Sequence, residues 1–299
     1  DSHSRRFGMP PAGMWPAEGA LSQGFAELLA AAGCRWSASG EGVLANSLRR
    51  PDSALPDRRQ YLYKPYRLEG THPLMLFFRD DRLSDLIGFE YAKWHGSDAA
   101  ANFVGELDAI ASAAPKDQCP VVSVILDGEN AWEFYPYNGF YFLDELYAAL
   151  EKHPGIACKT FADLDDRLAA AEPLPALVAG SWVYGDLATW IGSPDKNRAW
   201  DLLCEAKRSF DLVMAGHRLN ATETEAATRQ LADCEASDWF WWFGDYNPAE
   251  SVATFDRLFR QKLSHLYHLL KLPSPAELDA PVSLGNKHQE VSTAMRRAS

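Results

Sequence analysis

Residues 121–132 read VVSVILDGENAW, in which six apolar or small residues end abruptly at Asp127 and Gly128. A run of this length and β-branched content is typical of a strand covered on both faces, as in a parallel sheet. Such sheets place their ligands at the carboxyl ends of their strands. We therefore expect a buried strand at 121–126 that presents Asp127 at the edge of an α/β sheet. Alternatively, Asp127 caps the next helix.

Trp132 lies directly behind this acidic turn, together with Glu129 and Asn130. An indole ring offers a flat apolar face and one donor, and carboxylate and amide groups bind hydroxyls. The combination suits a sugar, which has apolar faces and polar edges. The segment is equally compatible with Trp132 as a core residue.

The charge of the chain limits the classes of partner. Its 299 residues carry a formal net charge of −12, with a pI near 5.1. Nucleic acids and anionic membranes select for clustered Lys and Arg, so we expect neither as a partner. A neutral substrate such as a glucan is indifferent to this charge. No apolar stretch approaches the length of about 18 residues that a membrane-spanning helix needs.

The cysteines and histidines give no sign of a metal site or cofactor, and we expect none. The five cysteines are scattered and form no CxxC pair. We interpret them as free thiols in a reducing cytoplasm. His72 and His95 stand alone, without a ligand spacing such as HxxxH, and both are interpreted as structural.

Strand and helix patterns alternate through residues 1–173, which favours an α/β layer or barrel. The expected helices are 22–32, 84–94, 97–114 and 140–152, and the expected strands are 61–68, 74–79 and 121–126. Residues 174–271 instead predict a helical bundle with helices at 195–215, 222–236 and 248–270. Thr222 and Glu225 have the spacing of a capping box. Residues 272–299 read as a linker or tail.

A second carboxylate, Glu18, stands in the segment GMWPAEGALS (13–22), just before a helix capped by Ser22. On its own, Glu18 is more simply explained as a surface residue near a helix start. Together with Asp127 it suggests glycoside cleavage. That reaction needs one carboxyl group to protonate the leaving oxygen and another to attack the anomeric carbon or activate water.

Four ordered segments resemble the glycoside hydrolases of family 57, the retaining enzymes that act on α-glucans. They are GMWPAEGALS (13–22), LDGENAWE (126–133), GSWVYGDLATWIGSPDKNRAWDLL (180–203) and DWFWWFGD (238–245). The last segment resembles the amylopullulanase-like members. The resemblance implies an α-amylase, an amylopullulanase or a 4-α-glucanotransferase, with α-glucan as substrate.

The resemblance also implies a fold and two catalytic roles. The family fold is an incomplete seven-stranded (β/α) barrel followed by an α-helical bundle that closes over the site. We assign 1–173 to the carboxyl-proximal part of the barrel and 174–271 to the bundle. Glu18 falls at the family's catalytic nucleophile and Asp127 at its acid/base.

Further residues are candidates for contacts with the sugar. Trp15 and Trp132 could flank the reacting ring, or pack in the core. In the third segment, Trp190 is the strongest candidate for such a contact, followed by Trp182, whereas Asp195 is also placed to cap a helix.

In the last segment, Trp241, Trp242 and Asp245 could line a subsite. A helix that is aromatic on every side is more often buried. Another apolar run ends in Arg79, Asp80 and Asp81, with Asp85 four residues later, and we expect a buried Arg and carboxylate network rather than a solvated turn.

The resemblance is incomplete at the amino terminus. The family's first two motifs, including a His-containing first strand, have no counterpart in this sequence. We therefore expect, as a partner, the missing amino-terminal half of the same protein. The alternative is a catalytically incomplete relative that binds glucan through its tryptophans.

Overall fold

The computed structural model describes residues 2–68, 73–128 and 131–286, which form two compact units. Asp1–Asp186 form the first unit and Leu187–Ser299 the second. The boundary follows Asp186, whereas the sequence pattern changes near residue 173. The intervening chain stays with the first unit because Leu21 and Gly180 form an antiparallel bridge. Glu129, Asn130, His72 and the tail from residue 287 lie outside the described residues.

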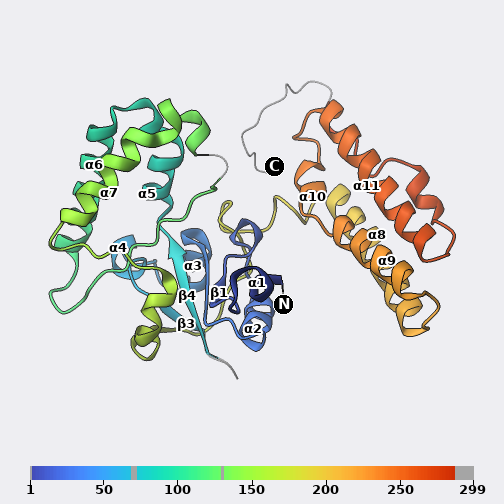
Figure 1. The fold of residues 1–299 in the computed structure, drawn as a ribbon, viewed down its shortest axis with the longest axis horizontal. Coiled ribbons are helices and arrows are strands. Elements are labelled where there is room, and N and C mark those ends of the chain that lie inside the picture. The colour runs from blue at the N-terminus through green and yellow to red at the C-terminus, as the bar shows by residue number, and fades with distance from the viewer. Residues whose placement is uncertain (1, 69–72, 129–130, 287–299) are drawn as a thin grey trace. The chain divides into compact units, whose positions relative to one another are not determined.

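The first unit is built on a mixed five-stranded sheet with the order β1-β2-β4-β3-β5 (Figure 1). Its strands are β1 Gly13–Met14, β2 Trp36–Gly40, β3 Tyr66–Leu68, β4 Leu74–Arg79 and β5 Glu172–Leu174. The β1–β2, β2–β4 and β3–β5 pairs are parallel, and β3 runs antiparallel to β4. The predicted α/β class is confirmed.

The central strand β4 is buried along its whole length because both faces of the sheet are covered. Leu74, Leu76 and Phe78 point into a core shared with helices α2 (Gln23–Ala31) and α3 (Glu41–Leu48). Met75 and Phe77 point into a second core on the opposite face. This alternation is what a two-residue side-chain period produces.

The predicted strand at 121–126 is wrong, because the structure forms no strand over these residues. The segment makes one parallel bridge, from Ser123 to Arg79 at the end of β4. The antiparallel β3 already pairs with Leu74–Leu76 on this side of β4, so only the carboxyl end of β4 remains available. The apolar content of the segment reflects a different arrangement, since its side chains alternate between two cores.

The helices of the first unit follow the sequence pattern in part. Besides α2 and α3, they are α1 Ser2–Phe7, α4 Arg58–Tyr61, α5 Asp81–Asp85, α6 Gly96–Ala113 and α7 Phe140–Lys152. Helices α6 and α7 lie side by side (Figure 1). The predictions of α2, α6 and α7 are confirmed. The predicted helix 84–94 is broken into α5, a π-helical turn at Leu86–Glu90 and a 3-10 turn. Asp80 starts α5 early because its carboxylate accepts a hydrogen bond from Leu83 N.

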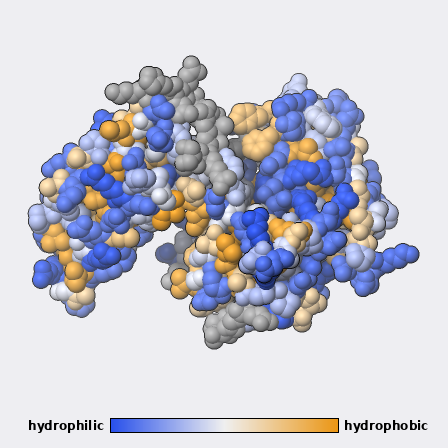
Figure 2. Space-filling model, turned by 180° about the vertical axis from the view of Figure 1, so that it is seen from behind, coloured by the Kyte–Doolittle hydropathy of each residue, from blue (hydrophilic) through white to orange (hydrophobic). Residues whose placement is uncertain are grey.

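The second unit is helical, as the pattern predicted. Its helices are α8 Pro194–Ala215, α9 Ala221–Cys234, α10 Asp238–Trp242 and α11 Ala249–Leu269. The capping box lies two residues earlier than predicted, with Asn220 and Glu223 in place of Thr222 and Glu225. Hydrophilic residues cover much of the visible surface, interspersed with small apolar groups (Figure 2).

Candidate active site

Glu18 sits in a 3-10 turn, Ala17–Gly19, next to the carboxyl end of β2. Its backbone is left-handed, with φ of 56°, a conformation that costs a non-glycine residue free energy. The turn is fixed from two sides. Ser39 on β2 donates a hydrogen bond to the Gly19 carbonyl, and the Trp182 amide donates one to the Glu18 carbonyl at 3.1 Å.

The Glu18 carboxylate accepts a hydrogen bond from Nε1 of Trp182 at 2.8 Å. The two residues are 164 positions apart, so the tertiary fold creates this contact. The hydrogen bond therefore fixes the orientation of the Glu18 carboxylate.

Trp15 and Trp182 form the apolar wall beside Glu18. Their rings meet edge to face, with centroids 5.1 Å apart. Two glycines allow this packing. A Cβ on Gly19 would lie 2.6 Å from the Trp15 ring, and a Cβ on Gly40 would lie 2.5 Å from the Trp182 Cα. The structure thus places Trp15, Trp182 and Glu18 together.

Arg79 occupies the end of β4 beneath this wall. Its side chain forms ion pairs with Asp81 at 2.8 Å and Asp85 at 2.7 Å, and the residue is only 8% exposed. Its guanidinium carbon lies 5.2 Å from the centroid of the Trp182 ring, and its Nε donates to the Ile125 carbonyl at 2.8 Å. The predicted Arg and carboxylate network is confirmed.

A second charged cluster adjoins the first. Asp80 is fully buried and accepts hydrogen bonds from Arg58 and from the Tyr63 hydroxyl. Arg58 also pairs with Glu41, whose carboxylate accepts from the Asp81 amide at 2.9 Å. Burial raises the pKa of Asp81 to about 6 and, aided by the Asp80 charge, that of Tyr63 to about 12.

Asp127 is half-buried and follows the extended segment 121–126. This segment is attached to the carboxyl end of β4 by the Arg79–Ser123 bridge and by the contacts of Ile125 with Arg79 and the Ser84 hydroxyl. Because β2 and β4 are parallel and Gly40 is in register with Arg79, the segments that carry Glu18 and Asp127 belong to the same edge of the sheet.

Trp132 is not part of the wall beside Glu18. It is half-buried against the core formed by α5, α6 and α7, with its ring centroid 5.5 Å from that of Tyr135. A Cβ on Gly139 would lie 2.9 Å from the Trp132 ring. These contacts pack the half-buried Trp132 against the core, and a contact with sugar stays a prediction.

The remaining predicted residues belong to the helical unit. Trp190 is 7% exposed, and its carbonyl accepts from Trp200. Asp195, in the first turn of α8, accepts from the Ser283 hydroxyl at 2.7 Å. Trp241 is half-buried and packs edge to face on Trp242, while Asp245 is exposed.

The helical unit also buries a cation that sequence reasoning missed. Lys196 is fully buried, and its ammonium contacts the Thr189 carbonyl and the Tyr246 hydroxyl. Burial lowers the pKa of Lys196 to about 8 and raises that of Tyr246 to about 12. The only signal in the sequence was the position of Lys196 within the third family segment.

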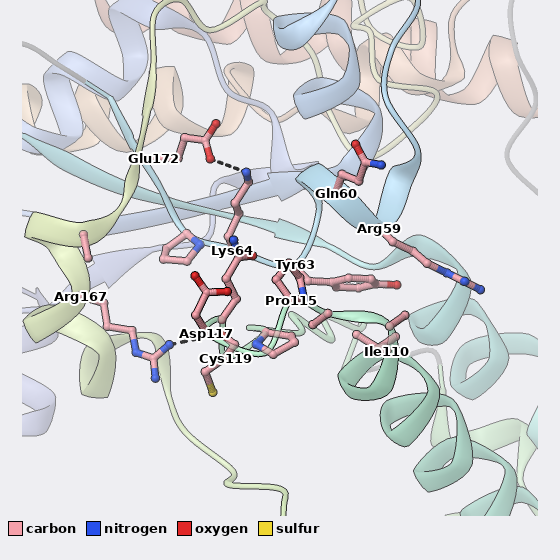
Figure 3. A pocket seen from close by; sticks show the side chains of 16 residues that line it. Arg59, Gln60, Tyr63, Lys64, Ile110, Pro115, Asp117, Cys119, Arg167 and Glu172 are labelled. Atoms are coloured by element: carbon pink, nitrogen blue, oxygen red, sulfur yellow. Dashed lines mark hydrogen bonds and ion pairs between the residues drawn. The ribbon is translucent and has the colours of Figure 1, made fainter.

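A separate cavity of about 360 Å³ lies between α4, the carboxyl end of α6 and the start of β5 (Figure 3). Its lining includes an ion pair of Lys64 with Glu172 and a hydrogen bond from Arg167 to the Cys119 carbonyl. None of the residues predicted for the site lines it.

Two features are absent from the part of the chain that the structure describes. No group of three or more His, Cys, Asp or Glu side chains there is placed to hold a metal ion. No helix among residues 2–68, 73–128 and 131–286 is long and apolar enough to cross a membrane.

Comparison with known proteins gives a family and a set of similar folds. The model of glycosyl hydrolase family 57 matches residues 2–172. No curated protein matches the sequence. Among solved structures, a branching enzyme from Thermococcus kodakaraensis, in complex with glucose, is 15% identical to this chain, with a TM-score of 0.71. The match covers 90% of this chain and 60% of the branching enzyme.

Two further structures are similar over a comparable share of the chain. The α-amylase AmyC from Thermotoga maritima is 16% identical, with a TM-score of 0.66, and the match covers 90% of this chain and 61% of AmyC. The 4-α-glucanotransferase from Thermococcus litoralis is 14% identical, with a TM-score of 0.58, and the match covers 89% of this chain and 43% of the glucanotransferase. The chain thus spans less than two thirds of the length of each of these proteins.

Proposed function

We propose, because the chain belongs to glycosyl hydrolase family 57, that it is a glycosidase or transglycosylase acting on α-glucans by a retaining mechanism. The observation that carries the proposal is the setting of Glu18. A carboxylate on a left-handed turn, beside a sheet edge, accepts a hydrogen bond from an indole that is itself part of an aromatic wall. The similar structures include a branching enzyme, a glucanotransferase and an amylase, which supports α-glucan as the substrate class.

The proposed reaction is a double displacement. Glu18 attacks the anomeric carbon while Asp127, protonated at the start, donates its proton to the departing glycosidic oxygen. Asp127 then takes a proton from water, or from a sugar hydroxyl in transglycosylation, and that oxygen displaces Glu18 from the anomeric carbon. Two inversions retain the configuration. The Trp182 hydrogen bond supports this role because it fixes the orientation of the Glu18 carboxylate.

Binding residues are proposed from the same geometry. Trp15 and Trp182 offer apolar surface beside Glu18, where a sugar ring could pack. Trp190, Asp195, Trp241 and Asp245 remain proposals for contacts made by the helical unit. The burial of Trp190 makes a direct contact with sugar less favourable than we expected from the sequence.

Two substrates with different leaving groups distinguish the proposed roles of Glu18 and Asp127. Glu18→Gln should abolish turnover of both maltooligosaccharides and nitrophenyl maltoside. Asp127→Asn should abolish turnover of maltooligosaccharides, yet retain a first burst of nitrophenol, because that leaving group needs no proton, followed by slow turnover because Asp127 is also the base of the second step. Retained turnover of maltooligosaccharides in either variant would remove that residue from its role.

The same experiment separates the enzyme from a glucan-binding relative. A binder would retain maltooligosaccharides without releasing product, and both substitutions would leave its affinity unchanged. Circular dichroism would confirm that each variant remains folded. Product analysis on amylose and pullulan would then distinguish hydrolysis from transfer.

A reducing compartment is also proposed. All five cysteines are free thiols, and Cys119, Cys158 and Cys204 are exposed. Exposed free thiols are typical of proteins kept in a reducing environment, which supports a cytoplasmic location.

A further inference from the structure

We propose that Arg79 is a positioning residue that aligns the supports of Glu18 and Asp127 with each other. Its catalytic consequence depends on the function proposed above, whereas its effect on the geometry of Trp182 does not. The inference rests on three directed contacts of one buried guanidinium, each with a different segment of the chain.

The first contact reaches the nucleophile. The Arg79 guanidinium lies 5.2 Å from the centroid of the Trp182 ring, and Trp182 Nε1 lies 2.8 Å from the Glu18 carboxylate. A cation over an indole face attracts the ring and restricts its tilt. Arg79 therefore helps to hold the donor that is directed at Glu18.

The second contact reaches the segment of the acid. Arg79 Nε donates to the Ile125 carbonyl, two residues before Asp127. The backbone of Arg79 also forms a parallel β-bridge with Ser123 in this segment. Side chain and backbone of one residue thus attach the Asp127 segment to β4.

The third contact fixes Arg79 itself. Asp81 and Asp85 pair with its two terminal nitrogens, and the Glu41 carboxylate accepts from the Asp81 amide. Asp81 and Asp85 are therefore the charges that act directly on the guanidinium among the described residues, and Glu41 links them to the adjoining pair of Arg58 and Asp80.

Only arginine can make all of these contacts at once. A planar guanidinium donates in several directions while its face lies against a ring, whereas a lysine ammonium is a compact charge without a flat face. Arg79→Lys should therefore keep the charge and lose the alignment. Arg79→Met should lose both.

The test uses the protein labelled with 5-fluorotryptophan and followed by fluorine NMR. The Trp182 resonance is assigned as the one missing in Trp182→Phe. A pH titration of this resonance that disappears in Glu18→Gln reports the Glu18 carboxyl. We expect the resonance to shift in Arg79→Met and Arg79→Lys, and the titration midpoint to move to higher pH because Glu18 loses part of its donor.

Arg82→Met is the matched control, because Arg82 lies three residues away and its side chain forms a surface ion pair with Glu106. It should leave the Trp182 resonance unchanged. In turnover assays we expect the Arg79 variants to lose kcat by roughly 10- to 100-fold with little change in KM, as a small misplacement of reacting groups does.

An unchanged Trp182 resonance and an unchanged midpoint in folded Arg79→Lys would overturn the inference. This test depends on Arg79→Lys alone, so it can still be carried out if Arg79→Met fails to fold. If the resonance and midpoint shift as expected but the unsubstituted protein shows no turnover, the positioning role stands and the proposed function fails. Loss of kcat without any shift of the resonance would also overturn the role assigned to Arg79.

Discussion

Replacement of Asp80 by Asn should strongly destabilise the first unit. Asp80 is fully buried and accepts hydrogen bonds from Arg58 at 2.7 Å, from the Tyr63 hydroxyl at 2.8 Å and from Leu83 N at 2.9 Å. The amide keeps the shape of the side chain but removes its charge. Arg58 would then have only Glu41 to balance it.

The magnitude follows from this partial compensation. Removing one partner of a buried ion pair costs about 3 to 5 kcal/mol. Glu41 remains bound, and the Arg58 side chain is 29% exposed, so water can reach it. We therefore expect the lower end, about 3 kcal/mol of unfolding free energy. In a domain of this size that corresponds to a fall in Tm of about 6 to 12 °C.

Urea unfolding and thermal melts, both followed by circular dichroism, would measure the loss. Asp108→Asn is the matched control, because the Asp108 side chain is 54% exposed and pairs with His153 at the surface. It should cost less than about 1 kcal/mol. A loss of similar size in both variants would refute the view that the buried Asp80 cluster secures the end of β4.

Three further perturbations test separate features. The free energy of unfolding should rise by about 2 kcal/mol between pH 7 and 9.5 because of Lys196. Its pKa is about 8 in the folded state, so the unfolded chain binds more protons over this pH range. Urea titrations of Lys196→Met should lack that slope. Gly40→Ala should lower kcat/KM by roughly tenfold, because its Cβ would lie 2.5 Å from the Trp182 Cα, whereas Gly24→Ala, with open space around its Cβ, should leave activity unchanged. Asn220→Ala should cost about 1 kcal/mol in thermal melts, since it removes the cap of α9.

Local signals predicted part of the fold. The Ser22 cap, the limits of α7 and the apolar run of β4 depend on neighbouring residues, and each was predicted close to its observed position. By contrast, β2 was not predicted. Its sequence, WSASG, resembles a loop, yet Ser37 and Ser39 are buried. Their hydroxyls donate to carbonyls 23 and 20 positions away, partners that a local pattern cannot show.

The candidate site shows the same division. Strand-end reasoning and family resemblance singled out Glu18 and Asp127. The hydrogen bond from Trp182 to Glu18 joins residues 164 positions apart, and only the fold could identify it. For Trp132 the sequence left two interpretations, because an aromatic residue after a strand end has the same local sequence whether it faces a ligand or a core. The packing of its ring on Tyr135 depends on the tertiary fold.

The left-handed backbone of Glu18 has a consequence for how the protein could change over evolutionary time. Glycine adopts this conformation without a steric penalty, whereas a residue with a Cβ loses roughly 1 kcal/mol or more. The turn alone would therefore favour Gly at position 18. In a population where the proposed catalytic role of Glu18 is no longer under selection, position 18 should change toward glycine. Descendants that keep glutamate at this position would be those that still need the carboxylate.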